Sequence, residues 1–362
     1  MNKAFKQFLD LSKQDRIDVF EATAEGLNTL SIYIEKDFWV CLVLDLLYNE
    51  LPNDSPRLLF KGGTSLSKVY KLIKRFSEDV DFTVFRDDLG FIEDKDPLSP
   101  KISGKQRKRL SIELQEVTSN YICNKLKEDL EKATATILSD FSIVVDEDDS
   151  DRSTLLFQYP RLFPIEDTAY VKPRVKLEGG GRSALDPHQD CSIKPFIAEL
   201  EELNTWDFSV HNIMSIASER TFWDKVMILH GWHCGYRDQT KFLNDRQRVS
   251  RHYYDVAMIY KTEVAQNAIQ DSQLRENVRN HTQMLFKAAW KKLDEAIPGS
   301  MRLIPMDDLK TALESDYQAM QGMMLGEPPT FDEIVKAITE LEAQINENND
   351  LIKKDKINQD TI

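Results

Sequence analysis

The spacing of hydrophobic residues divides the chain into two parts. In the first 210 residues, helical spacing, as in residues 4–50, gives way to short apolar runs and strict alternation that are typical of strands. From about Ser215 onward the spacing is helical, apart from short breaks, of which the first lies near residues 231–247. A mixed first part followed by a helical second part predicts an α+β fold.

Five short segments have the strand pattern, and Val171–Glu178 is the clearest, because its apolar and charged side chains alternate until three glycines end it. Another two flank an acidic stretch at 146–151, which predicts a hairpin with a solvated tip. Helices are expected at 66–73 and 111–138, with a polar connection over 86–108. The expected strands are 58–60, 79–85, 141–145, 154–159 and 171–178.

The composition limits the class of protein. Acidic residues outnumber basic ones, 61 against 47, and the net charge of −14 argues against a general nucleic-acid coat. A nucleic-acid substrate stays compatible with this charge, because local basic patches decide contact.

Three features bear on the compartment. The four cysteines form no CxxC pair, which is typical of reduced thiols. The N-terminus lacks an apolar signal core. The longest apolar run, Val40–Leu47, is interrupted by Asp45 and is too short to span a bilayer. We therefore expect a cytoplasmic protein with no membrane association.

The most informative stretch joins a glycine turn to an acidic strand. Asp79-Val80-Asp81 begins an expected strand, and alternate residues of a strand share a face, so Asp79 and Asp81 point the same way. Two neighbouring carboxylates repel each other, and a bound divalent cation relieves this repulsion. Mg²⁺ carried by a nucleoside triphosphate (NTP) is the common biological form of such a cation.

The glycine turn precedes this strand and suits a phosphate. Gly62 and Gly63 let a phosphate approach the backbone, while Thr64 and Ser65 open an expected helix whose N-terminus attracts anions. We expect these four residues to bind phosphate oxygens through backbone N–H and hydroxyl groups. Each motif alone is common. Strand, glycine turn, helix and acidic strand nevertheless follow in one order between residues 60 and 84, which predicts a phosphate-binding turn beside a metal site.

These residues support a resemblance to a known family. Phe60-Lys61-Gly62-Gly63-Thr64-Ser65 with Arg75-Phe76-Ser77-Glu78-Asp79-Val80-Asp81 resembles the signature of the AbiEii/AbiGii abortive-infection toxins, in the polymerase-β-like nucleotidyltransferase superfamily. Further similar segments extend the resemblance over nearly the whole chain. They are Glu35–Val40, Pro173–Glu178 with Arg182-Ser183, Glu219–Lys225, Arg251–Asp255, Pro328–Phe331 and Ile345-Asn346.

The resemblance implies a polymerase-β-like core with a small mixed sheet. Residues 1–212 would form the nucleotidyltransferase domain, and residues 213–362 a helical domain that closes over the nucleotide. Such enzymes carry a third acidic ligand on a neighbouring strand, and Glu178 is the candidate here. The other interpretation of Glu178 is a surface ion pair, since Arg174 and Lys176 share its strand face.

Two charged residues lie in apolar helical segments of the second part. Lys225 and Asp255 should both be buried, and each then needs a partner of opposite charge. We expect them to face each other near the nucleotide, as catalytic residues, with Lys225 also binding the triphosphate. The alternatives are a purely structural ion pair and a lysine that reaches solvent.

A basic and aromatic stretch lies between these two residues. Trp232 and Tyr236 are interleaved with its cations, which suits contact with RNA or a triphosphate. A solvated loop balanced by Asp238 and Asp245 explains the stretch equally well. The basic residues are Arg237, Lys241, Arg246, Arg248 and Arg251.

Two smaller features complete the candidates. Ser77 lies two residues before Asp79 and would orient the turn, while its phosphorylation would place negative charge beside the carboxylates and block activity. His230, His233 and Cys234 form an incomplete zinc set at unsuitable spacing, so we expect no zinc there.

Three hypotheses describe the function. The first is an Mg²⁺-dependent nucleotidyltransferase that moves a nucleoside monophosphate (NMP) from an NTP to an acceptor hydroxyl and releases pyrophosphate. The resemblance implies an RNA acceptor, with the tRNA 3′ end as leading candidate, and a toxin role in phage defence, opposed by an antitoxin from a neighbouring gene. The second hypothesis makes a protein hydroxyl the acceptor, an AMPylator-like activity. The third is a nucleotide- or partner-binding module without catalysis.

Overall fold

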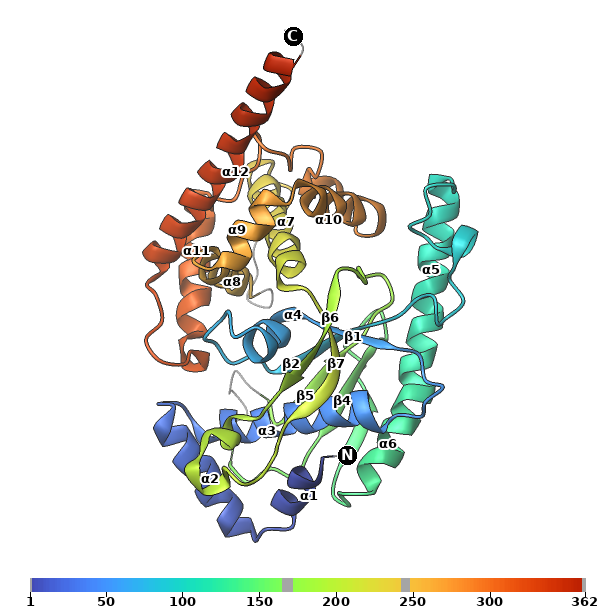
Figure 1. Cartoon of the computed structure of the whole chain (residues 1–362), viewed down its shortest axis with the longest axis vertical. Helices are drawn as coiled ribbons and strands as arrows, with labels where there is room; N and C mark the ends of the chain where they lie inside the picture. The colour runs from blue at the N-terminus through green and yellow to red at the C-terminus, as the bar shows by residue number, and fades with distance from the viewer. Residues whose placement is uncertain (1, 165–171, 242–247, 360–362) are drawn as a thin grey trace. The chain divides into compact units, whose positions relative to one another are not determined.

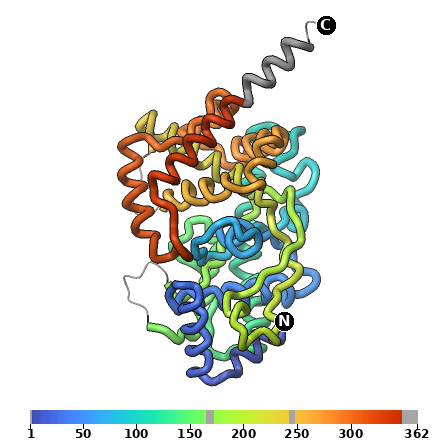
Figure 2. Tube along the Cα trace, turned by 60° about the vertical axis from the view of Figure 1, so that its left-hand side comes forward, coloured from blue at the N-terminus to red at the C-terminus, as the bar shows by residue number. Residues whose placement is uncertain are grey.

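The computed structural model describes residues 2–164, 172–241 and 248–359, with side chains up to residue 347 (Figure 1). The chain forms two compact units. Unit 1 comprises Met1–Ala217 and Met323–Gly326, and unit 2 comprises Ser218–Gly322 and Glu327–Ile362. The chain of unit 1 can be followed from the blue N-terminal helices to the yellow-green strands in Figure 2.

Unit 1 is built on a seven-stranded mixed sheet in the order β3-β4-β5-β2-β1-β7-β6. The central strands β2 and β5 are parallel, as are β1 and β7, whereas β1 and β2 are antiparallel. The outer pairs β3–β4 and β6–β7 are antiparallel. The strands are β1 (Leu58–Lys61), β2 (Asp79–Val84), β3 (Ser142–Val145), β4 (Thr154–Gln158), β5 (Arg174–Glu178), β6 (His188–Ile193) and β7 (Val210–Ile216).

The helices of unit 1 cover mainly one face of this sheet. Helix α3 is buried in all but its first two residues and contacts β2, β5 and β7. Wide π-helical turns extend α3 over Leu46–Glu50 and join α5 to α6 over Tyr121–Leu126. The helices are α1 (Lys3–Leu9), α2 (Lys13–Gly26), α3 (Ser31–Asp45), α4 (Gly62–Thr64), α5 (Gly104–Asn120) and α6 (Lys127–Ala135).

The main core lies on the face that α3 covers. Phe38 and Trp39 of α3 pack in one cluster with Val80 of β2 and Leu177 of β5, all of them buried. Because side chains alternate along a strand, the neighbours of Val80 on β2, Asp79 and Asp81, point to the opposite face. A small apolar cluster of described residues, with Leu59, Phe85, Leu185 and Ile216, lies apart from the main core. One face of the sheet is thus buried in the main apolar core, and the other carries the side chains of Asp79 and Asp81.

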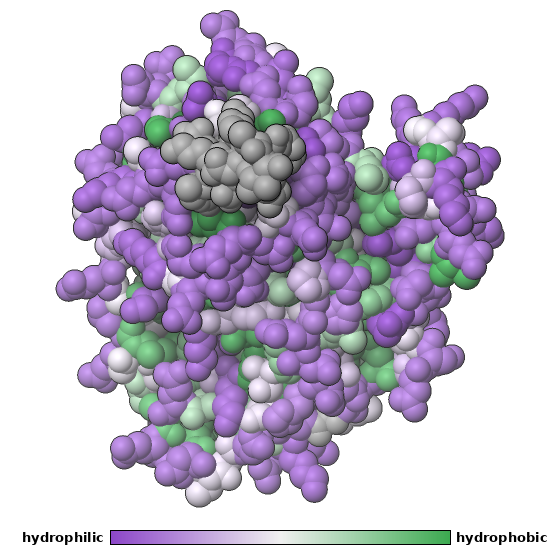
Figure 3. Space-filling model, turned by 45° about the horizontal axis from the view of Figure 1, so that its top comes forward, coloured by the Kyte–Doolittle hydropathy of each residue, from purple (hydrophilic) through white to green (hydrophobic). Residues whose placement is uncertain are grey.

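Unit 2 is helical. Helix α7 is buried along most of its length and contacts α8, α9 and α10, while α12 contacts α8. The helices are α7 (Ser218–Arg237), α8 (Ser250–Tyr260), α9 (Glu263–Gln270), α10 (Ser272–Leu285), α11 (Asp307–Ala319) and α12 (Phe331–Gln359). On the molecular face in Figure 3, hydrophilic residues predominate and apolar ones form small separate groups.

The predicted α+β class is confirmed, and four local predictions are corrected. The helix expected at 66–73 is a short π-helical turn that ends at Val69. Strands β6 and β7 were not expected. Helix α5 begins at Gly104, inside the segment expected to be a polar connection. Helix α7 continues to Arg237, although the sequence predicted a break from residue 231. Tertiary burial of α7 explains this last difference, since packing outweighs the local glycines and polar residues.

Candidate active site

The two acidic residues of β2 lie on one face of the sheet, at its centre. In the parallel register with β5, Asp79 is opposite Lys176 and Asp81 is opposite Glu178. On the other side, Asp81 is opposite Lys61 of β1, the residue just before the glycine turn. The predicted pairing of the two carboxylates on one face is therefore present.

The glycine turn touches this strand directly. Gly62 has φ of +83°, and a Cβ atom there would lie only 2.0 Å from Oδ2 of Asp81. A Cβ on Gly63 would lie 2.7 Å from the guanidinium of Arg75 and 2.8 Å from Oγ of Ser77. No side chain fits at either position without displacing a neighbour, so both positions need glycine for contact, and Gly62 needs it for conformation as well.

The hydroxyl groups of the turn have protein partners. Thr64 and Ser65 are fully buried. Oγ1 of Thr64 donates to the backbone carbonyl of Asp79, and Oγ of Ser65 donates to the carbonyl of Gly62 at 2.9 Å. These hydroxyls therefore fasten the turn to β2. That their hydroxyl and backbone N–H groups bind phosphate oxygens stays a prediction.

Ser77 contributes to the same arrangement. Its Oγ lies 3.0 Å from Oγ1 of Thr64, and its side chain is half-buried. Because the single proton of Thr64 goes to the Asp79 carbonyl, the Ser77 hydroxyl donates to Thr64. This contact orients the turn, as one of the two interpretations proposed. Control by phosphorylation of Ser77 stays a prediction.

Negative charge is concentrated around Asp79. Burial, together with the charges of Glu78, Glu178 and Asp81, raises the pKa of Asp79 to about 7. The positive charge of Lys36 opposes this effect. A cation bound at these carboxylates would lower the pKa of Asp79, since it favours the ionised form.

The donor set fits Mg²⁺ that arrives with a nucleotide. Carboxylate oxygens are the ligands that Mg²⁺ prefers, and one or two of them suffice when phosphates and waters complete its coordination. Among the residues that the structure describes, no group of three His, Cys, Asp or Glu side chains is gathered as a self-sufficient metal site. Asp79 and Asp81 are thus suited to share an ion with a substrate rather than to hold one alone.

Glu178 lies where the sequence placed the third acidic residue, on the strand beside Asp81. Its carboxylate forms an ion pair with Lys176, whose Nζ also lies 3.9 Å from Oδ2 of Asp146. The side chain of Glu178 is 39% exposed. The ion-pair interpretation of Glu178 is therefore realised, and its role as a metal ligand stays a prediction.

Sequence reasoning missed a charged triplet on α3 that supports the site. Lys36, buried, donates to Glu78 at 2.5 Å and to the carbonyl of Lys172 at 2.9 Å. Its neighbour Asp37 forms a buried ion pair with Lys68 at 2.7 Å. Glu78 precedes Asp79, and Lys68 follows the glycine turn, so one helix holds both halves of the site.

Glu35 completes the triplet. Its carboxylate accepts the backbone N–H of Leu162 at 2.7 Å, and burial raises its pKa to about 7. The signal for these residues was in the sequence, because three consecutive charges interrupt an otherwise apolar helix. Such charges are buried only when each finds a partner.

In unit 2, Lys225 and Asp255 meet as predicted. Nζ of Lys225 lies 2.8 Å from Oδ2 of Asp255, and both side chains are buried. Nζ also lies 3.5 Å from Nδ1 of His252 on the same helix as Asp255. The ion pair joins α7 to α8, and a role toward a nucleotide stays a prediction.

Comparison with known proteins places the chain. The sequence profile of a family described as "Nucleotidyl transferase AbiEii toxin, Type IV TA system" matches residues 45–337. The chain belongs to the AbiEii toxin family. It is therefore a nucleotidyltransferase toxin, which uses an NTP, and it is one half of a type IV toxin–antitoxin system, which includes a cognate antitoxin.

Among solved structures, this AbiEii protein is similar to MenT4, a nucleotidyltransferase toxin from Mycobacterium tuberculosis H37Rv. The two share 14% identity with a TM-score of 0.36, over 86% of this chain and 99% of that chain. No curated protein matches the chain. In the part of the chain that the structure describes, no helix is both long and apolar enough to cross a bilayer.

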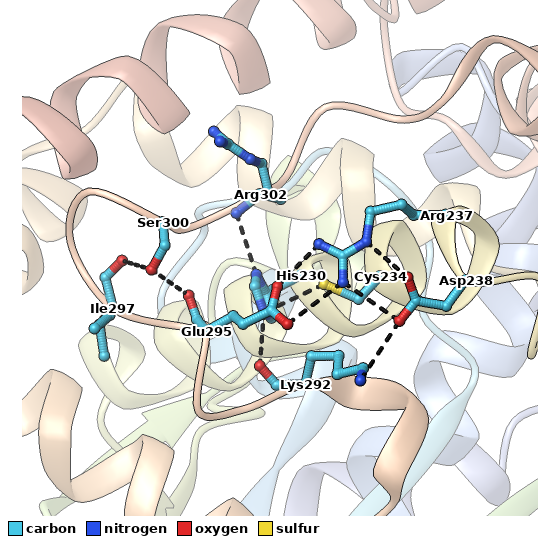
Figure 4. A network of polar contacts seen from close by, with 9 residues as sticks. All are labelled: His230, Cys234, Arg237, Asp238, Lys292, Glu295, Ile297, Ser300 and Arg302. Atoms are coloured by element: carbon cyan, nitrogen blue, oxygen red, sulfur yellow. Dashed lines mark hydrogen bonds and ion pairs between the residues drawn. The ribbon is translucent and has the colours of Figure 1, made fainter.

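The residues of the basic stretch of this AbiEii protein have different surroundings in the structure. Arg237 forms ion pairs with Asp238 at 2.8 Å and Glu295 at 2.9 Å (Figure 4). Lys241 lies 5.6 and 5.5 Å from the ring centres of Trp232 and Trp290. Arg248 lies two residues before α8, Arg251 lies in its first turn, and Arg246 lies outside the described residues. Contact with RNA or a triphosphate stays a prediction for this set.

His230 and Cys234 are engaged in the same network (Figure 4). Nδ1 of His230 accepts the backbone N–H of Arg302 at 3.1 Å, so Nε2 carries the proton and donates to the Lys292 carbonyl at 3.1 Å. Burial also lowers the pKa of His230. Both ring nitrogens thus serve the fold of unit 2.

Proposed function

We propose that this AbiEii toxin transfers an NMP from an NTP to the 3′-terminal hydroxyl of tRNA and releases pyrophosphate. The hydroxyl oxygen forms a bond to the α-phosphorus while the bond to the bridging oxygen of the β-phosphate breaks, and the hydroxyl proton is released. The observation that carries the proposal is the direct contact of the Gly62 turn with Asp81, beside Asp79.

Asp79 and Asp81 would hold Mg²⁺ together with the triphosphate. When bound, the ion would neutralise developing charge on the phosphates and the leaving pyrophosphate. The backbone at Gly62 and Gly63 would receive phosphate oxygens, because the turn exposes main chain without side chains. Thr64, Ser65 and Ser77 would keep that turn against β2 through their hydrogen bonds.

The remaining predicted residues belong to the same proposal. Residues 1–212 would act as the nucleotidyltransferase domain, and residues 213–362 would close over the nucleotide with the Lys225–Asp255 pair. Arg237, Lys241, Arg246, Arg248 and Arg251 would contact the RNA or the triphosphate. In the cytoplasm, modification of tRNA would stop growth, as in abortive infection, until the antitoxin of the neighbouring gene acts.

A labelled-nucleotide experiment tests the proposal. The purified full chain is incubated with Mg²⁺, total tRNA, a protein extract and each of four α-labelled NTPs in turn. We expect label in tRNA, and its loss after removal of the 3′-terminal nucleotides. Label in protein alone would establish the AMPylator-like alternative. Absence of label from both fractions, with folding verified, would contradict nucleotidyl transfer to either acceptor.

A further inference from the structure

A cavity that is open to solvent lies in unit 1, where strands β3 and β5 begin and strand β4 ends. Its volume is about 750 Å³. The described residues that line it come from the ends of these strands and from the segments beside them. They include Tyr159, Arg161, Lys172, Arg174 and Asp140.

The lining is cationic, although the whole chain carries a net charge of −14. Among the described residues that line the cavity, Arg161, Lys172 and Arg174 are positively charged and Asp140 is negatively charged. Within residues 2–164, 172–241 and 248–359, the side chains of Arg161 and Arg174 form no hydrogen bond or ion pair. Arg174 is half-buried and Arg161 is exposed. Most of the buried or half-buried arginines that the structure describes are paired, so the unpaired Arg174 in a cavity indicates an external anion.

An aromatic ring lines the same cavity. Tyr159 is stacked on Trp39, with ring centres 5.0 Å apart and planes 12° apart, which fixes its position. Its hydroxyl is buried and has no hydrogen-bond partner among the described residues. Tyr159 is only 7% exposed and belongs to the main core, so its ring supports the wall of the cavity, and the arginines are the groups that would contact the phosphates of a nucleic-acid strand.

The sheet register relates the cavity to the carboxylates. Arg174 lies on β5 two residues before Lys176, which is opposite Asp79, and alternation puts Arg174 on the same face. Two residues of a strand span about 7 Å. The Gly62 turn lies at Asp81, on the other side of Asp79. The cavity and the glycine turn therefore flank Asp79 from opposite directions.

The cavity and the glycine turn, on opposite sides of Asp79, offer separate places for the acceptor strand and the NTP. In phosphoryl transfer the attacking and leaving oxygens are roughly in line, on opposite sides of the phosphorus. If the leaving pyrophosphate lies at the glycine turn, the attacking hydroxyl arrives from the side of Arg174. We infer that the cavity binds backbone phosphates of a nucleic-acid acceptor strand next to its reacting hydroxyl. This inference rests on the proposed function and names the place where the acceptor binds.

The test measures binding without turnover. A fluorescent single-stranded RNA is titrated with the full chain, without NTP, at several salt concentrations. The RNA has about twelve nucleotides, which is within the usual size of a single-strand binding site. The variant Arg161→Ala/Arg174→Ala should bind this RNA about tenfold or more weakly. The slope of log affinity against log salt should become shallower by about 1.4, since each single-strand phosphate contact contributes about 0.7. Affinity for ATP should not change.

Two further variants act as controls. Lys127→Ala/Lys132→Ala removes two positive charges from exposed ion pairs on α6, and it should bind RNA as the wild type does. Arg161→Lys/Arg174→Lys should bind more tightly than the double-alanine variant, because lysine still attracts a phosphate as a point charge.

Several results would overturn the inference. They are unchanged RNA binding by the double-alanine variant, an equal loss in the α6 control, and a loss of ATP affinity with RNA affinity unchanged. The last would assign the cavity to the triphosphate. Because the readout is binding alone, a failure of nucleotidyl transfer is detected separately, by the labelled-NTP reaction.

Discussion

At the scale of single residues, Gly62 and Asp81 define the site through one contact. A side chain at Gly62 would meet the Asp81 carboxylate, and the backbone there is in the left-handed region. We expect Gly62→Ala to displace Asp81 and reduce transfer at least about a hundredfold, since misplacement of about 1 Å has that effect. Backbone strain should also lower stability by about 1–2 kcal/mol.

Gly90→Ala is the matched control for this prediction. Gly90 has the same φ of +83°, but a Cβ atom there meets nothing within 4 Å. It should show the same backbone strain with unchanged transfer. Rates of label incorporation and melting temperatures of the two variants check this. Equal activity of both variants would show that the contact with Asp81 is unimportant.

Glu35 makes stability depend on pH. Its pKa is raised from 4.5 to about 7 in the folded chain, so between these values the folded state holds a proton that the unfolded state has lost. Stability from this group is therefore present below pH 4.5 and is lost as pH rises toward 7. The full effect is about 3 kcal/mol, at 1.36 kcal/mol for each pH unit.

Glu35→Gln should remove this dependence. The stability of the variant minus that of the wild type should be larger at pH 8 than at pH 5. Thermal unfolding of both proteins at the two pH values measures this quantity. A constant difference in melting temperature between pH 5 and pH 8 would contradict the assignment.

At this scale the sequence predicted the placement of the acidic pair, whereas it did not show which groups the hydroxyls of the turn contact. Alternation alone placed Asp79 and Asp81 on one face, because a strand leaves no other choice. The roles of Thr64 and Ser65 could not be read in the same way. Whether a hydroxyl faces a ligand or a backbone carbonyl depends on how the turn packs on β2, and that packing is set by residues distant in the sequence.

At the scale of elements, α3 connects to the site through Lys36. Removing the ammonium would leave Glu78 buried, negative and next to Asp79. We expect Lys36→Met to lower stability by about 3–5 kcal/mol, the usual effect of breaking a buried ion pair. In the double variant Lys36→Met/Glu78→Gln much of this loss should disappear, because no buried charge remains.

Urea denaturation of the wild type, Lys36→Met, Glu78→Gln and the double variant measures the coupling free energy between the two side chains. Lys132→Met is the matched control, since Lys132 and Glu128 are 2.6 Å apart but both well exposed. It should change stability by less than about 1 kcal/mol. Equal effects of Lys36→Met and Lys132→Met would refute a supporting role for α3.

Two strands with one face buried in the main core were predictable from the alternation of their residues. Strands β2 and β5 alternate cleanly, and both were expected. Strand β6 escaped prediction because it is an edge strand whose residues are mostly exposed and polar, as in His188–Cys191. Its pairing with β7, rather than its own composition, makes it a strand.

At the scale of the whole molecule, the chain combines a sheet unit with a helical unit, as its hydrophobic spacing predicted. The relation between the units could not be predicted, because spacing describes burial within an element. Family membership assigns the toxin activity to the whole chain.

Growth of a bacterial host tests that assignment. Induced expression of the wild-type chain should arrest growth, and co-expression of the neighbouring antitoxin gene should restore it. Asp79→Asn should leave growth normal at equal protein level, because the arrest requires catalysis. Arrest by this variant would instead support a binding module without catalysis.

The most direct test of the central claim is the rate of NMP transfer by Asp81→Asn and Asp79→Asn. Both substitutions preserve shape and remove a negative charge from the face of β2. With melting temperatures at or above that of the wild type, each should transfer label to RNA at least about a hundredfold more slowly. Transfer at the wild-type rate by either variant would contradict the claim that this carboxylate pair, beside the Gly62 turn, is the catalytic centre.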